Sequence, residues 1–202
     1  MALNFANNNS LSAITTKPSG LSGGALNLIS TQTASSSSTI SFTSGIDSTY
    51  DEYVFKFYDI HVSNVENYEM GFQCSTDGGS SYGVTATTTL FQGVRGESGS
   101  PGSVSYNTGN DLAQSTNFQP LMLNLDNADD SSHSGQLTIF SPSSDTFVKH
   151  FIADGTNMFF NDGAGRQFVA GYFNTTSPLN AVQFKFNSGN IDSGVIKLYG
   201  IS

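Results

Sequence analysis

From residue 26 onward, apolar and polar side chains alternate with a period of two, which is the spacing of β-strands. The clearest example is the stretch 53–63, YVFKFYDIHVS. One of its faces carries Tyr53, Phe55 and Phe57. The other face is also largely apolar and carries Val54, Tyr58, Ile60 and Val62. This pattern predicts a strand that is covered on both sides.

The same alternation recurs in a series of short stretches separated by turns, and no window shows the pattern of a capped amphipathic helix. The predicted strands are 26–34, 39–43, 53–63, 68–75, 82–90, 118–126, 135–141, 146–153, 166–174, 181–187 and 194–201. Many short strands at this spacing indicate an all-β chain. The predicted fold is an antiparallel β-sandwich of jelly-roll-like type.

The breaks between strands suggest which strands are paired. Asp77-Gly78-Gly79 has the chemistry of a hairpin turn and lies between strands 68–75 and 82–90. The strand that ends at Ile201 is predicted to pair with 181–187 as a C-terminal hairpin. Segment 154–165 is predicted as a break, and 93–117 as a long Gly- and Ser-rich loop that is either mobile or a contact surface.

Residues 1–25 differ from the rest of the chain. They are rich in Asn, Ser and Gly, and their isolated apolar residues follow neither the helical nor the strand period. A disordered tail and an extended arm that docks on a neighbouring subunit both fit this pattern. We therefore divide the chain into an extended N-terminal attachment arm, 1–25, and a β-sandwich domain, 26–202.

Composition narrows the classes of partner. Charged residues make up only 11 % of the chain, so its polarity comes from short neutral side chains that suit contacts with neighbours or with sugars. The net charge is −9, and the seven cations are scattered, so we expect no nucleic-acid binding. No apolar run approaches the ~20 residues of a membrane span, and the N-terminus lacks the pattern of a secretory signal. The single cysteine, Cys74, is in phase with apolar neighbours and is predicted to lie in the core.

Residues that could support catalysis are few. A nucleophilic triad would need a histidine within reach of a serine and an acid, and the chain has His61, His133 and His150. It has no Gly-x-Ser-x-Gly motif, and GESGS around Ser98 has a different spacing. No phosphate- or dinucleotide-binding fingerprint occurs either. We expect no catalytic residues and no cofactor.

The segment 125–135, LDNADDSSHSG, is the one candidate for a metal site. Its carboxylates, Asp126, Asp129 and Asp130, with His133 nearby, are the hard oxygen ligands that Ca²⁺ prefers. Their spacing does not match an EF-hand loop, and acidic residues are common in solvated hairpin turns. The sequence therefore leaves a solvated turn as the expectation and these three aspartates as the metal candidates.

The end of the chain resembles a family of phage proteins. Ser193, Gly194, Ile196, Leu198, Tyr199 and Gly200 match the Ser-Gly-x-Ile-x-Leu-Tyr-Gly ending of virion surface proteins from tailed bacteriophages of marine and cyanobacterial hosts. The segment 41–63 and the opening MALNFANNNSLSAIT are similar to the corresponding parts of those proteins. Together these segments cover about a third of the chain.

The resemblance implies a structural protein located in the virion, at the particle surface, and supplies no catalytic residues. The expected role is an exposed tail-fibre or appendage module that contacts the host surface, including host surface polysaccharide. The alternatives are a capsid decoration protein on the phage head and a carbohydrate-binding or carbohydrate-cleaving β-sandwich domain.

The expected partners are other virion proteins, contacted through the arm, and further copies of the chain. The resemblance suggests a homotrimer, since such knobs often assemble around threefold axes. The strand 53–63 adds a physical motive, because a strand that is apolar on both faces needs a second cover. Either the loop 93–117 or a neighbouring subunit could supply that cover.

Overall fold

The computed structural model describes residues 26–62, 68–99, 101–160 and 162–201. These residues form twelve β-strands. The strands are β1 (Leu26–Thr33), β2 (Ile40–Phe42), β3 (Glu52–Val62), β4 (Tyr68–Ser75), β5 (Ala86–Gly96), β6 (Ser103–Tyr106), β7 (Gln119–Leu125), β8 (His133–Phe140), β9 (Lys149–Phe159), β10 (Gly163–Phe173), β11 (Ala181–Phe186) and β12 (Ile191–Ile201). In this part of the chain no helix is long and apolar enough to cross a membrane.

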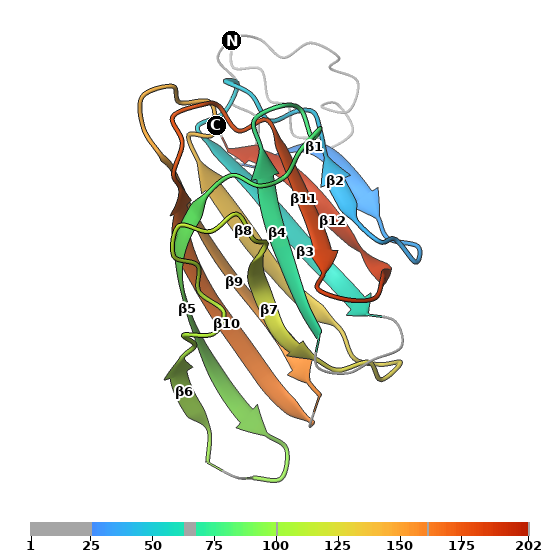
Figure 1. The fold of residues 1–202 in the computed structure, drawn as a ribbon. Coiled ribbons are helices and arrows are strands. Elements are labelled where there is room, and N and C mark those ends of the chain that lie inside the picture. The colour runs from blue at the N-terminus through green and yellow to red at the C-terminus, as the bar shows by residue number, and fades with distance from the viewer. Residues whose placement is uncertain (1–25, 63–67, 100, 161, 202) are drawn as a thin grey trace, which may run out of the picture.

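The strands form two antiparallel layers (Figure 1). The larger layer has the order β1-β12-β3-β8-β9-β10-β5-β6, and the smaller layer has the order β7-β4-β11-β2. One pair of residues, Leu125 in β7 and Phe159 in β9, joins the two layers. The prediction of an all-β, antiparallel sandwich is thus confirmed.

The strands are paired in a nested order. β3 pairs with β12, β4 with β11, and β5 with β10, so the first half of the chain is matched in reverse by the second half. A long two-stranded ribbon that folds over itself produces this order, and it gives the sandwich its jelly-roll-like character.

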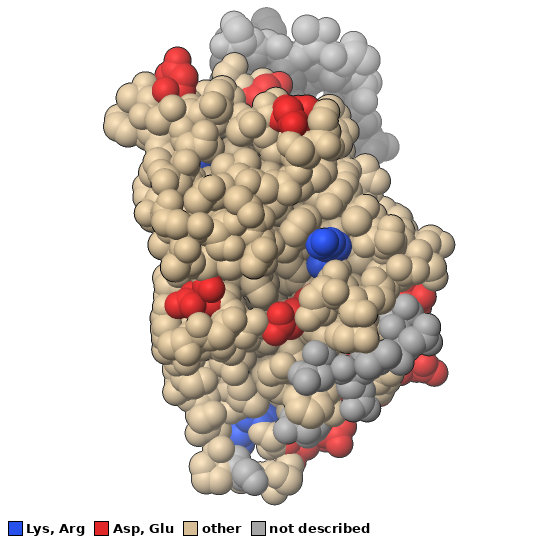
Figure 2. Space-filling view, in the orientation of Figure 1, with Lys and Arg blue, Asp and Glu red and all other residues tan. Residues whose placement is uncertain are grey.

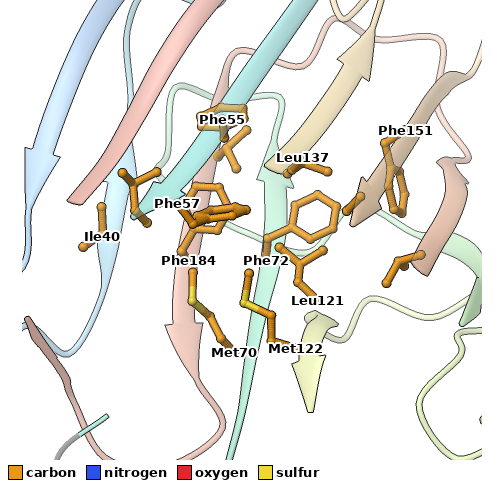
Figure 3. Packing of buried hydrophobic residues seen from close by; sticks show 14 of the residues in the cluster. Ile40, Phe55, Phe57, Met70, Phe72, Leu121, Met122, Leu137, Phe151 and Phe184 are labelled. Carbon is orange, nitrogen blue, oxygen red and sulfur yellow. The ribbon is translucent and has the colours of Figure 1, made fainter. Parts of the chain in front are cut away.

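Phenylalanine rings lie at the centre of the core between the layers, packed among aliphatic side chains (Figure 3). Phe184 of β11 lies 5.3 Å from both Phe55 and Phe57 of β3, measured between ring centroids, in edge-to-face contact. Phe72 of β4 makes the same kind of contact with Phe151 of β9, at 5.0 Å. Phe suits this interior because it fills volume without needing a hydrogen-bond partner. Cys74 is fully buried there, as predicted, and its burial raises the pKa of the thiol.

The predicted C-terminal hairpin is wrong. β11 and β12 are consecutive, but β11 lies in the smaller layer between β4 and β2, whereas β12 lies in the larger layer between β1 and β3. The turn between them, with Gly189 at φ 77°, carries the chain from one layer to the other. Both strands have one buried face, so the alternation of side chains could not reveal which neighbours they pair with.

The hairpin predicted at Asp77 is wrong for the same reason. The turn exists and is well made, because hydrogen bonds from Ser75 and Ser81 lower the pKa of the Asp77 carboxyl to about 2. It leads, however, from β4 in the smaller layer to β5 in the larger one. The residues of the turn thus predicted correctly that the chain changes direction here, but they did not predict which strands pair.

Two segments predicted as irregular contain strands. The predicted loop 93–117 contains the end of β5 and all of β6. These two strands pair, with Val94 opposite Ser103 at one end and Phe91 opposite Tyr106 at the other. The predicted break 154–165 contains the end of β9 and the beginning of β10. The two strands remain paired up to Phe159, which lies opposite Gly163. Glycine and short polar residues in these segments concealed the strands, and in β6 all four residues are exposed.

A bulge corrects the predicted faces of β3. Asp59 has a φ of 49°, and the register of β3 against β8 shifts between Phe57 and Ile60. This extra residue changes the phase of the alternation, so Ile60 and Val62 point into the core together with Phe57. The outer face of β3 is therefore less apolar than the alternation predicted.

The glycines of the C-terminal motif have structural roles. Gly194 has a φ of 117°, and a Cβ there would lie 2.7 Å from the carbonyl oxygen of Asp59 at the bulge. A side chain at Gly200 would overlap the ring of Tyr50, which packs against the backbone of β12. These glycines thus lie in the part of β12 that fits closely against β3 and the segment before it.

Candidate functional site

The outward face of the larger layer carries a row of aromatic and polar side chains that the strand register places side by side. Phe168 of β10 lies opposite Phe91 of β5 on one side and Asp154 of β9 on the other. The row continues to Tyr106 of β6 and, in the other direction, to Gln136 of β8. We call this row, together with Arg166 of β10, the aromatic platform.

Two stacked rings form the centre of the aromatic platform. The centroids of Phe91 and Phe168 are 4.9 Å apart, and their planes differ by 16°. The Arg166 guanidinium lies 4.8 Å from the centroid of the Phe168 ring, a cation–π contact. Phe91 is 43 % exposed and Tyr106 is 53 % exposed, so the aromatic surface is open to solvent.

Polar groups with complementary roles border the rings. The Asp154 carboxylate accepts a hydrogen bond from Arg166 at 2.9 Å and another from the side-chain amide of Gln136 at 3.3 Å. On the side of β6, the Tyr106 hydroxyl donates to Asp111 at 2.6 Å. Arg166 uses one N–H for Asp154, and a guanidinium has five, so donors remain for a ligand.

A shallow depression of ≈ 360 Å³ adjoins the rings. Ile152 of β9, Ala170 of β10 and Thr89 of β5 extend its floor one step along the strands from Phe168 and Phe91. Ile152 is exposed and lines the depression beside Phe91, so the two side chains form one apolar patch. Apolar floor and polar border together give this surface the composition of a binding site.

The sequence reasoning missed the aromatic platform. Phe168 and Arg166 fell within a predicted strand, but Phe91 was placed just past the end of the strand 82–90, and Tyr106 was placed in a loop. The available signal was the continued alternation of Phe91, Gly93 and Arg95 after Leu90. Even that signal would have left the pairing of β5 with β10 unknown.

The three predicted metal candidates do not act as one group. Asp126 is buried, and its carboxylate accepts hydrogen bonds from the backbone N–H groups of Asn127 at 2.7 Å and Ala128 at 3.3 Å. Asp129 and Asp130 are exposed and line a different depression of ≈ 500 Å³. Over the described ranges, no cluster of three or more His, Cys, Asp or Glu side chains has an arrangement able to hold a metal ion. Asp126 therefore has a structural role in the turn.

One histidine does lie close to an acid and a serine, in the wrong order for a triad. Asp192 stands between the other two, since its carboxylate is 3.6 Å from His61 Nδ1 and accepts a hydrogen bond from Ser36 at 3.1 Å. In a catalytic triad the imidazole stands between serine and acid. His61 Nε2 is instead 3.2 Å from the carbonyl oxygen of Ala128. This arrangement links turns and cannot activate Ser36.

A polar patch lies inside the sandwich, on the inner faces of β8, β9 and β10. His133 and Asn157 are opposite each other in β8 and β9, and Gln167 of β10 is opposite Gly155, against which His133 packs. His133 and Gln167 are fully buried, and among the described protein groups neither side chain has a hydrogen-bond partner. Burial lowers the pKa of His133 from 6.5 to about 3, so its ring is neutral at ordinary pH.

Comparison of the chain with protein-family models, with curated proteins and with solved structures gives no match.

Proposed function

We propose that this protein is a structural component of a bacteriophage virion, an exposed tail-fibre or appendage module that contacts the host surface. One observation carries the proposal. The two described segments that resemble virion surface proteins, in β3 and β12, pair with each other from Glu52–Ile201 to Val62–Ile191. The resemblance therefore concerns a paired set of neighbouring strands, β3 and β12, and their close glycine contacts, and is not limited to an isolated motif.

The surface supports a role in contacts outside the cell. Figure 2 shows charged side chains scattered singly over the near face, with wide areas of neutral residues between them. A neutral surface of short polar side chains suits dense packing in a particle and contact with sugars. The aromatic platform adds one open apolar surface with polar groups at its border.

The proposal includes attachment through residues 1–25, the predicted arm, which lie outside the described residues. A decoration protein on the phage head is the second location for the same module, because both locations require a stable, displayed sandwich. The two locations differ in stoichiometry, since a head carries many equivalent sites and a tail carries few.

Purified particles of the phage that encodes this chain are expected to contain it in a few to a few tens of copies. Quantitative mass spectrometry, with the major capsid protein as the internal standard, measures that number. Hundreds of copies per particle would assign the protein to the head as a decoration. Absence from purified particles would refute the virion role in both locations.

Assembly as a homotrimer is also part of the proposal. The exposed leucines Leu26 and Leu28 lie on β1, an edge strand of the larger layer, where a neighbouring subunit could cover them. Light scattering on the purified protein is expected to give three times the chain mass of 21.4 kDa. A mass of one chain that persists on concentration would contradict the trimer. Replacing Leu28 with Asp should shift the mass toward one chain, while replacing the exposed Phe147 with Asp should not.

A further inference from the structure

We propose that the aromatic platform binds a neutral polysaccharide chain. The proposal rests on the host-contact function above and names the ligand class and the residues that bind it. Phe91, supported by the stacked ring of Phe168, would contact the apolar faces of the sugar rings, and Asp154, Arg166 and Gln136 would bind their hydroxyl groups.

The chemistry of a sugar matches the two kinds of group on this surface. A sugar ring has C–H faces that pack on aromatic rings, and hydroxyl groups around its rim that both donate and accept hydrogen bonds. Phe91, which is 43 % exposed, supplies an open apolar surface, and the half-buried ring of Phe168 stacks behind it. Asp154 supplies acceptors and Arg166 supplies donors directly beside it.

The charges favour a neutral ligand over an acidic one. Asp154 and Arg166 neutralise each other at 2.9 Å, so the platform offers no unpaired cation to an acidic polymer. The whole chain carries a net charge of −9, which repels polyanions at a distance. A neutral polysaccharide avoids both costs.

The dimensions favour a chain over a single sugar. The row from Gln136 to Tyr106 crosses the five strands β8, β9, β10, β5 and β6. Neighbouring strands are about 4.8 Å apart, so the row is about 19 Å long. This length accommodates several linked sugar units, and because the row lies on an open sheet face the polymer can continue beyond both ends.

A second copy of this chain fits the same surface less well. The centres of protein–protein interfaces are depleted of charged residues, because each charge must be desolvated on association. On the aromatic platform the Asp154–Arg166 pair lies next to the central ring Phe168, with the two side chains 36 % and 57 % exposed. Sugar hydroxyls can replace water around these groups without removing their hydrogen bonds.

Affinity electrophoresis tests the proposal with the purified, full-length protein. Native gels would contain one of four soluble neutral polysaccharides, namely dextran, hydroxyethylcellulose, galactomannan or arabinogalactan, or carboxymethylcellulose as an acidic counterpart. At least one neutral polymer is expected to retard the protein. Phe91→Ala and Phe168→Ala should each weaken that binding about tenfold, and Arg166→Gln should also weaken it. Phe147→Ala is the control. Phe147 is 72 % exposed and lies just before the start of β9, away from the platform, so its removal should leave binding unchanged.

The outcomes separate this proposal from its alternatives. Lack of retardation by all four neutral polymers would overturn it, as would binding that is equally strong in Phe91→Ala and Arg166→Gln variants with unchanged melting temperatures. Retardation by carboxymethylcellulose alone would overturn the neutral ligand. A fall in oligomeric mass in Phe91→Ala would show that the platform is a subunit interface. None of these results would change the copy number in particles, so the virion role is judged independently.

Discussion

Acidification from pH 6.5 to pH 5 is expected to lower the free energy of unfolding by about 2 kcal/mol through the single side chain of His133. In the folded protein burial holds the pKa of His133 at about 3, whereas in the unfolded chain the ring has its ordinary value of 6.5. Below pH 6.5 the unfolded chain therefore binds a proton that the folded protein does not. The free energy of unfolding is therefore highest above pH 6.5. It falls as the pH decreases, and the loss due to His133 levels off below about pH 3.

A non-titrating substitution isolates this effect. His133→Gln keeps a neutral polar side chain in the interior patch, and the difference between its pH profile and that of the wild type should grow by about 1.4 kcal/mol for each pH unit below 6.5. His150→Gln is the matched control, because His150 is an exposed histidine on the adjacent strand β9. Urea denaturation at several pH values measures both. Parallel profiles for the wild type and His133→Gln would contradict a buried, neutral His133.

Ending the chain after Gly194 is expected to leave a protein that is insoluble or unfolded. The deletion removes most of β12, which lies between β1 and β3 and contributes the buried residues Ile196 and Leu198. Each buried apolar side chain of this size is worth about 1.5–3 kcal/mol. The loss also exposes both neighbouring strands, and in sum it is comparable to the 5–15 kcal/mol by which a typical domain is stable. A soluble product with a cooperative thermal transition would contradict the pairing of β12 between β1 and β3.

Point substitutions give a graded form of the same test. Leu198→Ala should lower the free energy of unfolding by about 2–5 kcal/mol, because it leaves a cavity between the layers. Lys197→Ala changes the preceding residue, which lies on the outward face over the ring of Tyr58, and should cost less than about 1 kcal/mol. Urea denaturation compares the two. Equal losses would mean that the two faces of β12 are not distinguished by burial.

The elements of the fold were largely readable from the sequence, because most strands have one face in the core, unlike β6, whose residues are all exposed. The alternation of Phe55 and Phe57, or of Phe184 and Phe186, carries that information locally. The partners of each strand were not readable. Both hairpin predictions, at Asp77 and at the C-terminus, failed where a tight turn carries the chain between layers. A turn and a layer crossing have similar local chemistry, and only packing over the whole chain distinguishes them.

The aromatic platform could not be predicted for a related reason. Its residues come from β5, β6, β8, β9 and β10, and their proximity depends on four strand registers. The aspartates 126, 129 and 130, by contrast, are close in sequence and attracted attention for that reason. In the structure the hydrogen bonds of Asp126 to its own turn separate it from the other two. Sequence proximity was a poor guide to a site on a sheet built from distant segments.

The nested pairing has a consequence for how the protein is made. Gly200 pairs with Tyr53, so the neighbouring strands β12 and β3 join residues from the two ends of the described domain. Such distant pairing makes folding slow, because a long loop must close before the contact is gained. We expect the chain to stay unfolded on the ribosome until β12 has emerged. Incomplete chains would then lack a folded surface to assemble with, and translation itself would exclude truncated subunits from the particle.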